Sequence, residues 1–365
     1  MKVLLVSPLP PPSGGIASWT KHVLAYFKAN INDIELIHYN TGGGIRRITD
    51  FSLIKRVFFG LKDLNQRVND IINIALKEKV DVVHLTSSAS LGIFRDYKML
   101  NRLKKYNYKT CIHFRFGRIP DLAAKKNWEW LCLRKVCALA SSVIVIDLNS
   151  YNTLIDYGYK NVYYLPNPIS ETIESKLKKS IIENREDGSV LFVGHITRFK
   201  GVFELVSACS QIKEVTTLTL IGPYEKSVYK KLVSIAGLKN GKHWLEFTGN
   251  KDQQYILERM QRCSVFVLPS YTEGFPNVIL ESMASAAPIL ATDVGAIPDM
   301  LNVDSEYPVG ICVKPMQTIG LKDCLMDLLR NPQKSIHMGR CAQRRVFDKY
   351  SMKSVIKNLI DIWSK

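Results

Sequence analysis

Two successive series of short apolar runs constrain the fold of this 365-residue chain more than any other feature. Each run is rich in β-branched and aromatic residues and alternates with helical patterns, which is typical of βαβ units and a parallel sheet. The first series predicts strands at Val3 to Ser7, Ile34 to His38, Val80 to Leu85, Thr110 to His113 and Ser142 to Ile146. The second predicts strands at Ser189 to Val193, Thr217 to Ile221, His243 to Thr248, Ser264 to Leu268 and Pro288 to Thr292. We therefore expect an α/β protein with two Rossmann-like domains, each built on a parallel sheet.

A polar, charged stretch separates the two series and marks the expected linker. It begins at Leu165-Pro-Asn-Pro168 and ends near Gly188. The length of the chain also favours about two domains. We predict an N-terminal domain over residues 1–168, a C-terminal domain over 169–345, and a C-terminal helix over 346–365 that crosses back to the N-terminal domain. The two domains are expected to face each other across a central cleft.

The net charge of +17 points to an acidic partner. Up to Ser170 there are 24 Lys/Arg against 12 Asp/Glu, so the basic excess lies mainly in the first half. Nucleic acid and an anionic membrane surface both fit this charge, and so does a solvated basic face with no partner. The segment from Asp50 to Lys62 interleaves aromatic and basic residues. It reads either as an amphipathic helix that docks on a membrane or as part of a core.

The chain shows no pattern for a membrane anchor or a metal site. The first apolar run is too short for a signal peptide, and no run approaches the roughly 20 residues of a membrane span. The eight cysteines contain no C-x-x-C pair, and no D-x-D pair is present. We expect a cytosolic protein with reduced thiols and no metal, peripheral on the inner face of the plasma membrane if it docks there.

The segment from Pro269 to Ala284 carries the strongest signal for a site. A buried strand precedes it, and a helix is expected to begin at about Asn277, with this residue as N-cap. The stretch from Gly274 to Asn277 would then cradle a phosphate at the helix N-terminus. Glu273 and Glu281 flank this cradle and would repel phosphates, so they are expected to accept hydrogen bonds from hydroxyl groups. A sugar nucleotide has this layout of hydroxyls, diphosphate and ribose.

Three further motifs follow predicted strands. Gly14 and Gly15 lie at the first strand-to-helix turn, where backbone could approach a ligand or simply form a tight turn. Arg198 and Lys200 follow the first strand of the second series and could neutralise a diphosphate. His113 ends a strand of the first series, where a structural role and a functional role are both open.

These motifs together resemble GT-B glycosyltransferases of family 4, also called group 1, the retaining type that uses nucleotide sugars. Glu273 to Glu281 fits the E-x7-E pattern of that family, and Val294-Gly-Ala-Ile-Pro-Asp299 follows the next strand. Gly194 to Gly201, Pro166-Asn-Pro168 and Gly14-Gly15 occur in the expected order. The resemblance spans most of the chain and is strongest in the second half.

The resemblance implies a role for each site residue. Glu273 would contact the donor sugar and Glu281 the ribose. Backbone at Gly274, Phe275 and Pro276, beside Asn277, would hold the diphosphate, with Gly14, Gly15 and Gly194 also on the donor. Lys200 and Arg198 would pair with the diphosphate, and His113 would lie near the reacting sugar. The family often has Arg where this chain has His195, so Arg198 would have to compensate.

We therefore expect a metal-independent retaining glycosyltransferase. Its donor would be a nucleotide sugar, a UDP-sugar rather than a GDP-sugar, bound by the C-terminal domain. Its acceptor would be a glycan, lipid-linked at the inner leaflet, bound by the N-terminal domain for surface polysaccharide or glycoconjugate synthesis. A GT-B epimerase or phosphorylase is the alternative, and a nucleic-acid-binding protein is a remote one.

Overall fold

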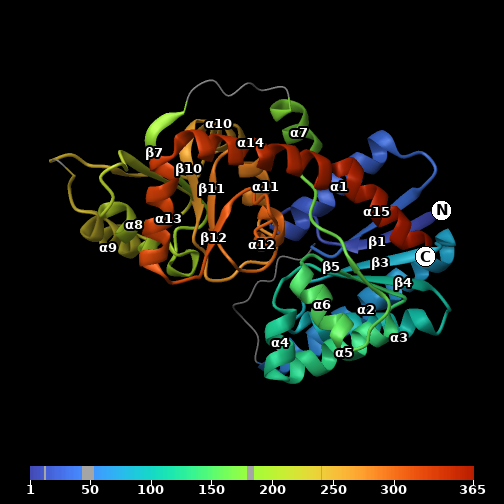
Figure 1. Cartoon of the computed structure of the whole chain (residues 1–365). Helices are drawn as coiled ribbons and strands as arrows, with labels where there is room; N and C mark the ends of the chain where they lie inside the picture. Colours follow the sequence, from blue (N-terminus) through green and yellow to red (C-terminus); the bar gives the residue numbers. More distant parts are fainter. Residues whose placement is uncertain (12–13, 43–52, 179–184, 240) are drawn as a thin grey trace. The chain divides into compact units, whose positions relative to one another are not determined.

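The computed structural model describes residues 1–11, 14–42, 53–178, 185–239 and 241–365, without the side chains of residues 53–64. Its internal contacts divide the chain into two units (Figure 1). Unit 1 consists of Met1–Pro166 and Ile356–Lys365, and unit 2 of Asn167–Val355. Each unit is built on one six-stranded sheet in which neighbouring strands are parallel. This confirms the predicted α/β class with two Rossmann-like sheets.

The sheet of unit 1 has the order β2-β1-β3-β4-β5-β6. Its strands are β1 Lys2–Ser7, β2 Glu35–Asn40, β3 Val82–Ser87, β4 Lys109–Phe114, β5 Ser142–Val145 and β6 Val162–Tyr164. The central strands are almost wholly buried, because helices cover both faces of the sheet. This double burial is why they read as continuous apolar runs rather than as alternating patterns.

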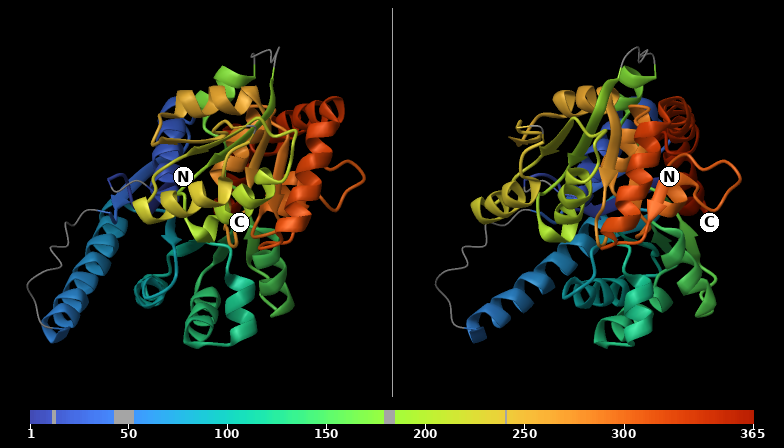
Figure 2. Two further views of the ribbon diagram at one scale, coloured as in Figure 1. Left: turned by 90° about the vertical axis from the view of Figure 1, so that its left-hand side faces the viewer. Right: turned by 60° about the vertical axis from the view of Figure 1, so that its left-hand side comes forward.

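Helices cover the sheet of unit 1 in two layers (Figure 1). One layer holds α2 Leu53–Glu78, α3 Gly92–Lys104, α4 Ile119–Lys125, α5 Trp128–Leu139 and α6 Leu148–Asp156. The other holds α1 Gly15–Asn30 and the end of α15 Met352–Ser364. Figure 2 shows the length of α2, whose first residues follow the undescribed stretch 43–52. The predicted docking segment from Asp50 to Lys62 lies outside the described side chains.

The sheet of unit 2 has the order β12-β11-β10-β7-β8-β9. Its strands are β7 Glu186–Val193, β8 Thr217–Ile221, β9 Leu245–Gly249, β10 Cys263–Leu268, β11 Ile289–Thr292 and β12 Ile311–Val313. Its helices are α7 Glu171–Leu177, the 3-10 turn η1 Arg198–Lys200, α8 Val202–Ser210, α9 Lys226–Ala236, α10 Gln253–Arg262, α11 Asn277–Ala284, α12 Ile297–Leu301, α13 Thr318–Arg330 and α14 Pro332–Lys349. The chain thus places α8 and α9 after β7 and β8, and α11 and α12 after β10 and β11.

The ten predicted strands all occur, with ends that shift by a few residues. The short edge strands β6 and β12 were not predicted. The helix predicted over residues 346–365 is interrupted, because α14 ends at Lys349 and α15 begins at Met352. Ile169 N–H donates to the Tyr350 carbonyl oxygen at 2.8 Å, so the interruption is tied to the start of unit 2.

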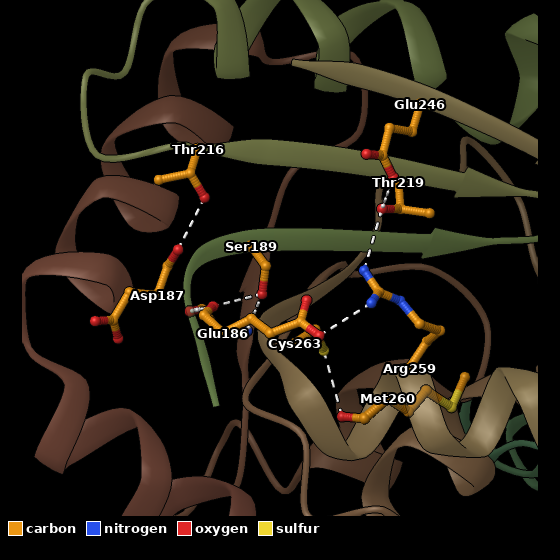
Figure 3. Close-up of polar contacts among 10 residues, drawn as sticks. Glu186, Asp187, Ser189, Thr216, Thr219, Glu246, Arg259, Met260 and Cys263 are labelled. Atoms are coloured by element: carbon orange, nitrogen blue, oxygen red, sulfur yellow. Dashed lines mark hydrogen bonds and ion pairs between the residues drawn. The ribbon is translucent and has the colours of Figure 1, made fainter. Parts of the chain in front are cut away.

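The amino ends of the central strands of unit 2 carry a polar network (Figure 3). Arg259 bonds Glu186 Oε1 at 3.0 Å and Thr219 Oγ1 at 3.5 Å, while Ser189 Oγ donates to the Glu186 carbonyl oxygen at 2.6 Å. Ligands of open α/β sheets bind at the carboxyl ends of strands, so this network lies at the opposite edge. We assign it a structural role.

The end of α15 is anchored in unit 1 by Trp363. This residue is 1% exposed, and its ring lies 5.6 Å from that of Phe27 on α1. Its Nε1–H donates to His84 Nδ1 of β3 at 2.9 Å. The last helix therefore belongs to the core of unit 1 although it starts in unit 2.

None of the helices within the described residues is long and apolar enough to cross a bilayer.

Candidate functional site

The sheet of unit 2 reverses its strand order between β7 and β10. From β7 the chain adds β8 and β9 on one side, and from β10 it adds β11 and β12 on the other. Ligands of such sheets bind beyond the carboxyl ends of the strands at this switch point. The loops after β7 and β10 carry Lys200 and Glu273, so the predicted residues lie where the topology favours a site.

The structure brings Lys200 and Glu273 together as an ion pair. Lys200 Nζ lies 2.6 Å from Glu273 Oε1, with side-chain exposed fractions of 29% and 12%. Tyr271 N–H also donates to the Phe199 carbonyl oxygen at 2.9 Å, so the two loops are joined by backbone as well. A cation thus stands beside a carboxylate at the edge of the sheet, where solvent still reaches it.

Gly201 allows the two loops to approach this closely. Its φ is +68°, and a Cβ there would lie 1.9 Å from the Pro269 carbonyl oxygen. Only glycine fits both the left-handed backbone and the contact. Sequence reasoning placed Gly201 in a motif without giving it this role.

Replacing Gly201 by alanine is expected to lower the free energy of unfolding of unit 2 by about 2 to 4 kcal/mol, from backbone strain plus overpacking. The matched control is Gly249→Ala, because Gly249 has a φ of +67°, close to that of Gly201, but no atom within 4 Å of the added Cβ. The control should lose only about 1 kcal/mol. Chemical denaturation of the two variants measures this difference, and equal losses would show that the contact with Pro269 contributes nothing.

The backbone between Gly274 and Asn277 presents open N–H groups. Within the described part of the chain, the N–H groups of Gly274, Phe275 and Asn277 donate no hydrogen bond. The loop is held from behind, since Ala296 N–H donates to the Gly274 carbonyl oxygen at 2.9 Å. A Cβ at Gly295, with φ +58°, would lie 2.3 Å from the Glu273 carbonyl oxygen. Open N–H groups at a helix N-terminus form a cradle for an anion.

The start of α11 differs in one detail from the prediction. The helix begins at Asn277, but Pro276 is the N-cap residue, with extended backbone and no side-chain cap bond. Asn277 Oδ1 instead accepts a hydrogen bond from Asn167 Nδ2 at 3.0 Å. Phe275 is buried and lies edge to face against Tyr350, 5.9 Å between centroids. The Asn277 side chain therefore ties the cradle to the linker rather than capping the helix.

Glu281 lies in the second turn of α11. Its Oε1 accepts a hydrogen bond from Gln253 Nε2 of α10 at 3.1 Å. Burial raises the pKa of the Glu281 carboxyl to about 7, against the opposing effect of the Gln253 amide. Burying a carboxylate with few partners is costly, which marks this residue as a candidate functional group. Nothing in the sequence signalled Gln253.

Arg198 and Gly194 occupy the same loop but differ from the predicted picture. Arg198 is exposed, and its guanidinium lies 5.3 Å from the centre of the Phe203 ring, not beside Glu273. Gly194 has φ +152°, and its carbonyl oxygen would lie 2.0 Å from a Cβ at Gly222. Gly222 thus permits the close approach to the Gly194 backbone, while Lys200 is the cation of the loop after β7 that meets the carboxylate.

Gly14, Gly15 and His113 belong to unit 1. Gly14 is the N-cap residue of α1 and Gly15 its first residue, and both are exposed with no atom within 4 Å of an added Cβ. They follow β1, which lies at the strand-order reversal of this sheet. Within the described residues, nothing crowds this helix start.

His113 is the penultimate residue of β4 and has no exposed surface. Arg115 Nη1 lies 3.3 Å from its Nε2, and the Trp19 ring lies edge to face at 5.3 Å. Its Nδ1 has no partner among the described residues. Burial, with Arg115 and His84 nearby, lowers the pKa of His113 well below its usual value. The imidazole is therefore neutral at pH 7 and keeps one nitrogen for a further hydrogen bond.

No three His, Cys, Asp or Glu side chains of the described residues gather as a metal site would require.

Comparison with known proteins shows what these features are similar to. Residues 174–345 match the model of the family described as glycosyl transferases group 1, which covers most of unit 2. An uncharacterized glycosyltransferase of Methanocaldococcus jannaschii, MJ1178, is 30% identical over 179 residues, 47% of this chain and 48% of the relative. Alpha-maltose-1-phosphate synthase of Mycobacterium tuberculosis is 26% identical over 190 residues, 48% of this chain and 47% of the relative. The chain thus spans about half the length of these curated relatives.

Solved structures share the fold over the whole chain. Sucrose-phosphate synthase from Thermosynechococcus elongatus superposes with a TM-score of 0.73 at 17% identity, covering 100% of this chain and 98% of that one. Anabaena Alr3699/HepE in complex with UDP gives 0.72 at 16% identity, covering 100% of both chains. Unit 2 is thus similar to group 1 glycosyl transferases over most of its length, and the chain shares the two-sheet GT-B fold of these solved structures.

Proposed function

We propose that this protein is a retaining glycosyltransferase of family 4. It moves a sugar from a nucleotide-diphosphate sugar, a UDP-sugar rather than a GDP-sugar, to a lipid-linked glycan acceptor in surface polysaccharide or glycoconjugate synthesis. The observation that carries this proposal is the juxtaposition of the Lys200 and Glu273 pair with the open N–H groups from Gly274 to Asn277. A cation and a helix N-terminus at one loop suit a diphosphate, and a carboxylate beside them suits sugar hydroxyls.

Each unit has its own part in this proposal. Unit 2 binds the donor: Glu273 accepts hydrogen bonds from the sugar, Glu281 from the ribose, and Lys200 faces the diphosphate. Unit 1 binds the acceptor, with His113 as a neutral hydrogen-bonding group at the reacting sugar and the α1 start at Gly14 and Gly15 near the donor. Arg198 has the smaller part, since it must leave the Phe203 ring to reach a phosphate.

In the proposed reaction the acceptor hydroxyl attacks the anomeric carbon from the face that the nucleotide diphosphate leaves. The bond from the anomeric carbon to the phosphate oxygen breaks, the new glycosidic bond forms, and the hydroxyl proton passes to the departing phosphate. Lys200 and the open N–H groups stabilise the charge that develops on the leaving group, which is the largest source of catalysis in such sites. No metal is required in this scheme.

Donor binding is expected to strengthen as the pH rises through about 7. Ribose hydroxyls donate to the carboxylate form of Glu281, whose pKa is about 7 in the unliganded protein. At pH 6 most of this group is protonated, so affinity for UDP-glucose should be about tenfold lower than at pH 8. UDP-glucose is the proper probe, because both of its phosphates are diesters without the proton of pKa near 6 that a terminal phosphate carries.

Glu281→Gln is the control for this pH dependence. It keeps the shape of the side chain but cannot titrate, so its affinity should be weaker and flat between pH 6 and pH 8. Calorimetric titrations of both proteins at three pH values give the comparison. A wild-type affinity that does not change with pH would remove Glu281 from the donor site.

Glycosyl transfer itself is tested by product analysis. The protein is incubated with UDP-sugars and GDP-sugars, with and without a polyprenyl-diphosphate glycan, and with EDTA in a parallel set. The proposal predicts UDP release that depends on the acceptor, persists in EDTA, and yields a product with the anomeric configuration of the donor. UDP release or sugar isomerisation without acceptor would favour an epimerase, and inversion would contradict the mechanism.

A further inference from the structure

Unit 1 exposes four large apolar side chains at the starts of α3 and α5. Leu91, Phe94, Trp128 and Leu131 have exposed fractions of 76%, 50%, 48% and 55%. Phe94 and Trp128 are stacked, with ring centroids 5.5 Å apart and an interplanar angle of 1°. Leu91 precedes Phe94 by three residues, and Leu131 follows Trp128 by three, so each leucine shares a helix face with one of the rings. We refer to these four residues as the α3–α5 patch.

An ionic network around the buried Glu129 carboxylate joins the helix starts at the α3–α5 patch. Arg118 donates to both oxygens of Glu129 at 2.7 and 2.8 Å and to Ser90 Oγ at 2.9 Å. Ser90 N–H donates to Glu129 Oε1 at 2.5 Å. Ser90 lies just before α3, Arg118 just before α4, and Glu129 in the first turn of α5. The Glu129 carboxylate therefore joins the starts of three helices, α3, α4 and α5. These contacts hold the helix starts that carry the exposed apolar side chains next to one another.

The surroundings of the patch are strongly basic. Between positions 90 and 139 there are twelve Lys/Arg against three Asp/Glu, and two of these acids, Asp96 and Glu129, are buried and paired. Four exposed cations lie within four residues of Trp128 or Leu131 in the sequence: Lys125 at the end of α4, Lys126 just after it, and Arg134 and Lys135 on α5. A stacked aromatic pair accompanied by such cations matches the interface of an anionic bilayer, where aromatic rings enter the headgroup region and cations meet lipid phosphates.

We propose that the α3–α5 patch docks this protein on an anionic lipid bilayer. This proposal rests on the proposed function and names the surface on which the enzyme works. A lipid-linked acceptor lies in the bilayer, so an enzyme docked on that bilayer would meet it there. A second copy of the chain fits the patch less well than a lipid bilayer does, because two copies would bring like charges together around the patch. The docking residues differ from the segment Asp50 to Lys62 that the sequence suggested.

Vesicle cosedimentation of the full-length protein tests this surface. The vesicles contain phosphatidylglycerol with phosphatidylcholine, or phosphatidylcholine alone. The apolar variant is Phe94→Gln with Trp128→Gln, and the charge variant is Lys125→Glu with Lys126→Glu. The matched control is Tyr307→Gln with Ile319→Gln, which removes two residues of unit 2 that are 75% and 73% exposed. Thermal unfolding of each variant verifies that it folds.

Wild-type protein is expected to bind the anionic vesicles at least tenfold more strongly than the neutral ones, and less strongly at high salt. The apolar and charge variants should each lose at least tenfold in binding, while the control keeps it. Equal binding by the apolar variant would overturn the proposal. Dimerisation of wild type that the apolar variant abolishes, or RNA that displaces the protein from vesicles through the same residues, would also overturn it.

Donor binding separates this proposal from the proposed function. All variants of the patch should retain wild-type affinity for UDP-glucose, because none of the substituted residues is among the proposed donor-binding residues. Vesicle binding without any nucleotide binding would leave the docking surface standing and the glycosyltransferase proposal refuted. Nucleotide binding without vesicle binding would refute the docking surface and leave the glycosyltransferase proposal standing.

Discussion

Replacing Lys200 by methionine is expected to lower kcat/KM for glycosyl transfer by about 10²- to 10³-fold, the usual loss when one group that stabilises a leaving anion is removed. Lys200 Nζ lies 2.6 Å from Glu273 Oε1, and Glu273 directly precedes the open N–H groups of Gly274 and Phe275. Methionine keeps the length of the side chain but removes its charge. Steady-state kinetics with the donor that binds most tightly measure the loss.

Lys230→Met is the matched control, because Lys230 is an exposed lysine on α9 of the same unit. It should keep wild-type kcat/KM. Glu273→Gln should also lose activity, and combining it with Lys200→Met should cost less than the sum of the two, since the residues act as one pair. Full activity in either single variant would contradict the assignment of this pair.

Trp363→Ala is expected to lower the free energy of unfolding of unit 1 by about 3 to 5 kcal/mol, as for other large buried aromatic side chains. The substitution removes a ring that is 1% exposed and leaves His84 Nδ1 without its donor. Trp363→Phe keeps most of the packing, so it should cost about 1 to 3 kcal/mol, the price of the unsatisfied imidazole. Urea unfolding followed by circular dichroism measures both.

Lys357→Ala controls for the helix itself, because Lys357 is exposed on α15. It should change stability by no more than about 0.5 kcal/mol. If Trp363→Ala unfolds like wild type, α15 does not contribute to the core of unit 1.

The strands could be predicted because each central strand is buried on both faces and therefore reads as an apolar run. Phe192, Val265 and Ile289 are fully or almost fully buried in their strands. The edge strands β6 and β12 have three residues each and are partly exposed, which leaves too little pattern to recognise. The interruption at Tyr350 also has no signal, since it depends on a tertiary hydrogen bond to Ile169.

The site was only partly predictable, because its pairing depends on strand order. Lys200 and Glu273 are 73 residues apart, and they meet because β10 lies next to β7. The position of Arg198 over Phe203 and the Asn277 bond to Asn167 depend on local packing that one sequence does not encode visibly. The pKa of Glu281 depends on its burial, which periodicity does not give.

The α3–α5 patch could not be predicted from the sequence at all. Aromatic residues at helical spacing usually belong to a core, and Trp130 of the same helix does, with 2% exposure. Phe94 on α3 and Trp128 on α5 are also aromatic residues of helices, but their side chains are exposed. The packing of the helices decides which aromatic side chains are buried and which are exposed. The patch could therefore be found only in the structure.

Unit 2 is proposed to bind a nucleotide diphosphate through Lys200, Glu281 and the α11 start. Calorimetric titration of the protein with UDP, GDP and ADP, without metal, measures this binding. We expect saturable binding of one nucleotide, UDP, that Lys200→Met and Glu281→Ala each weaken at least tenfold and Lys230→Met leaves unchanged. Absence of binding by all three nucleotides, or binding that neither site variant weakens, would refute the proposed donor site.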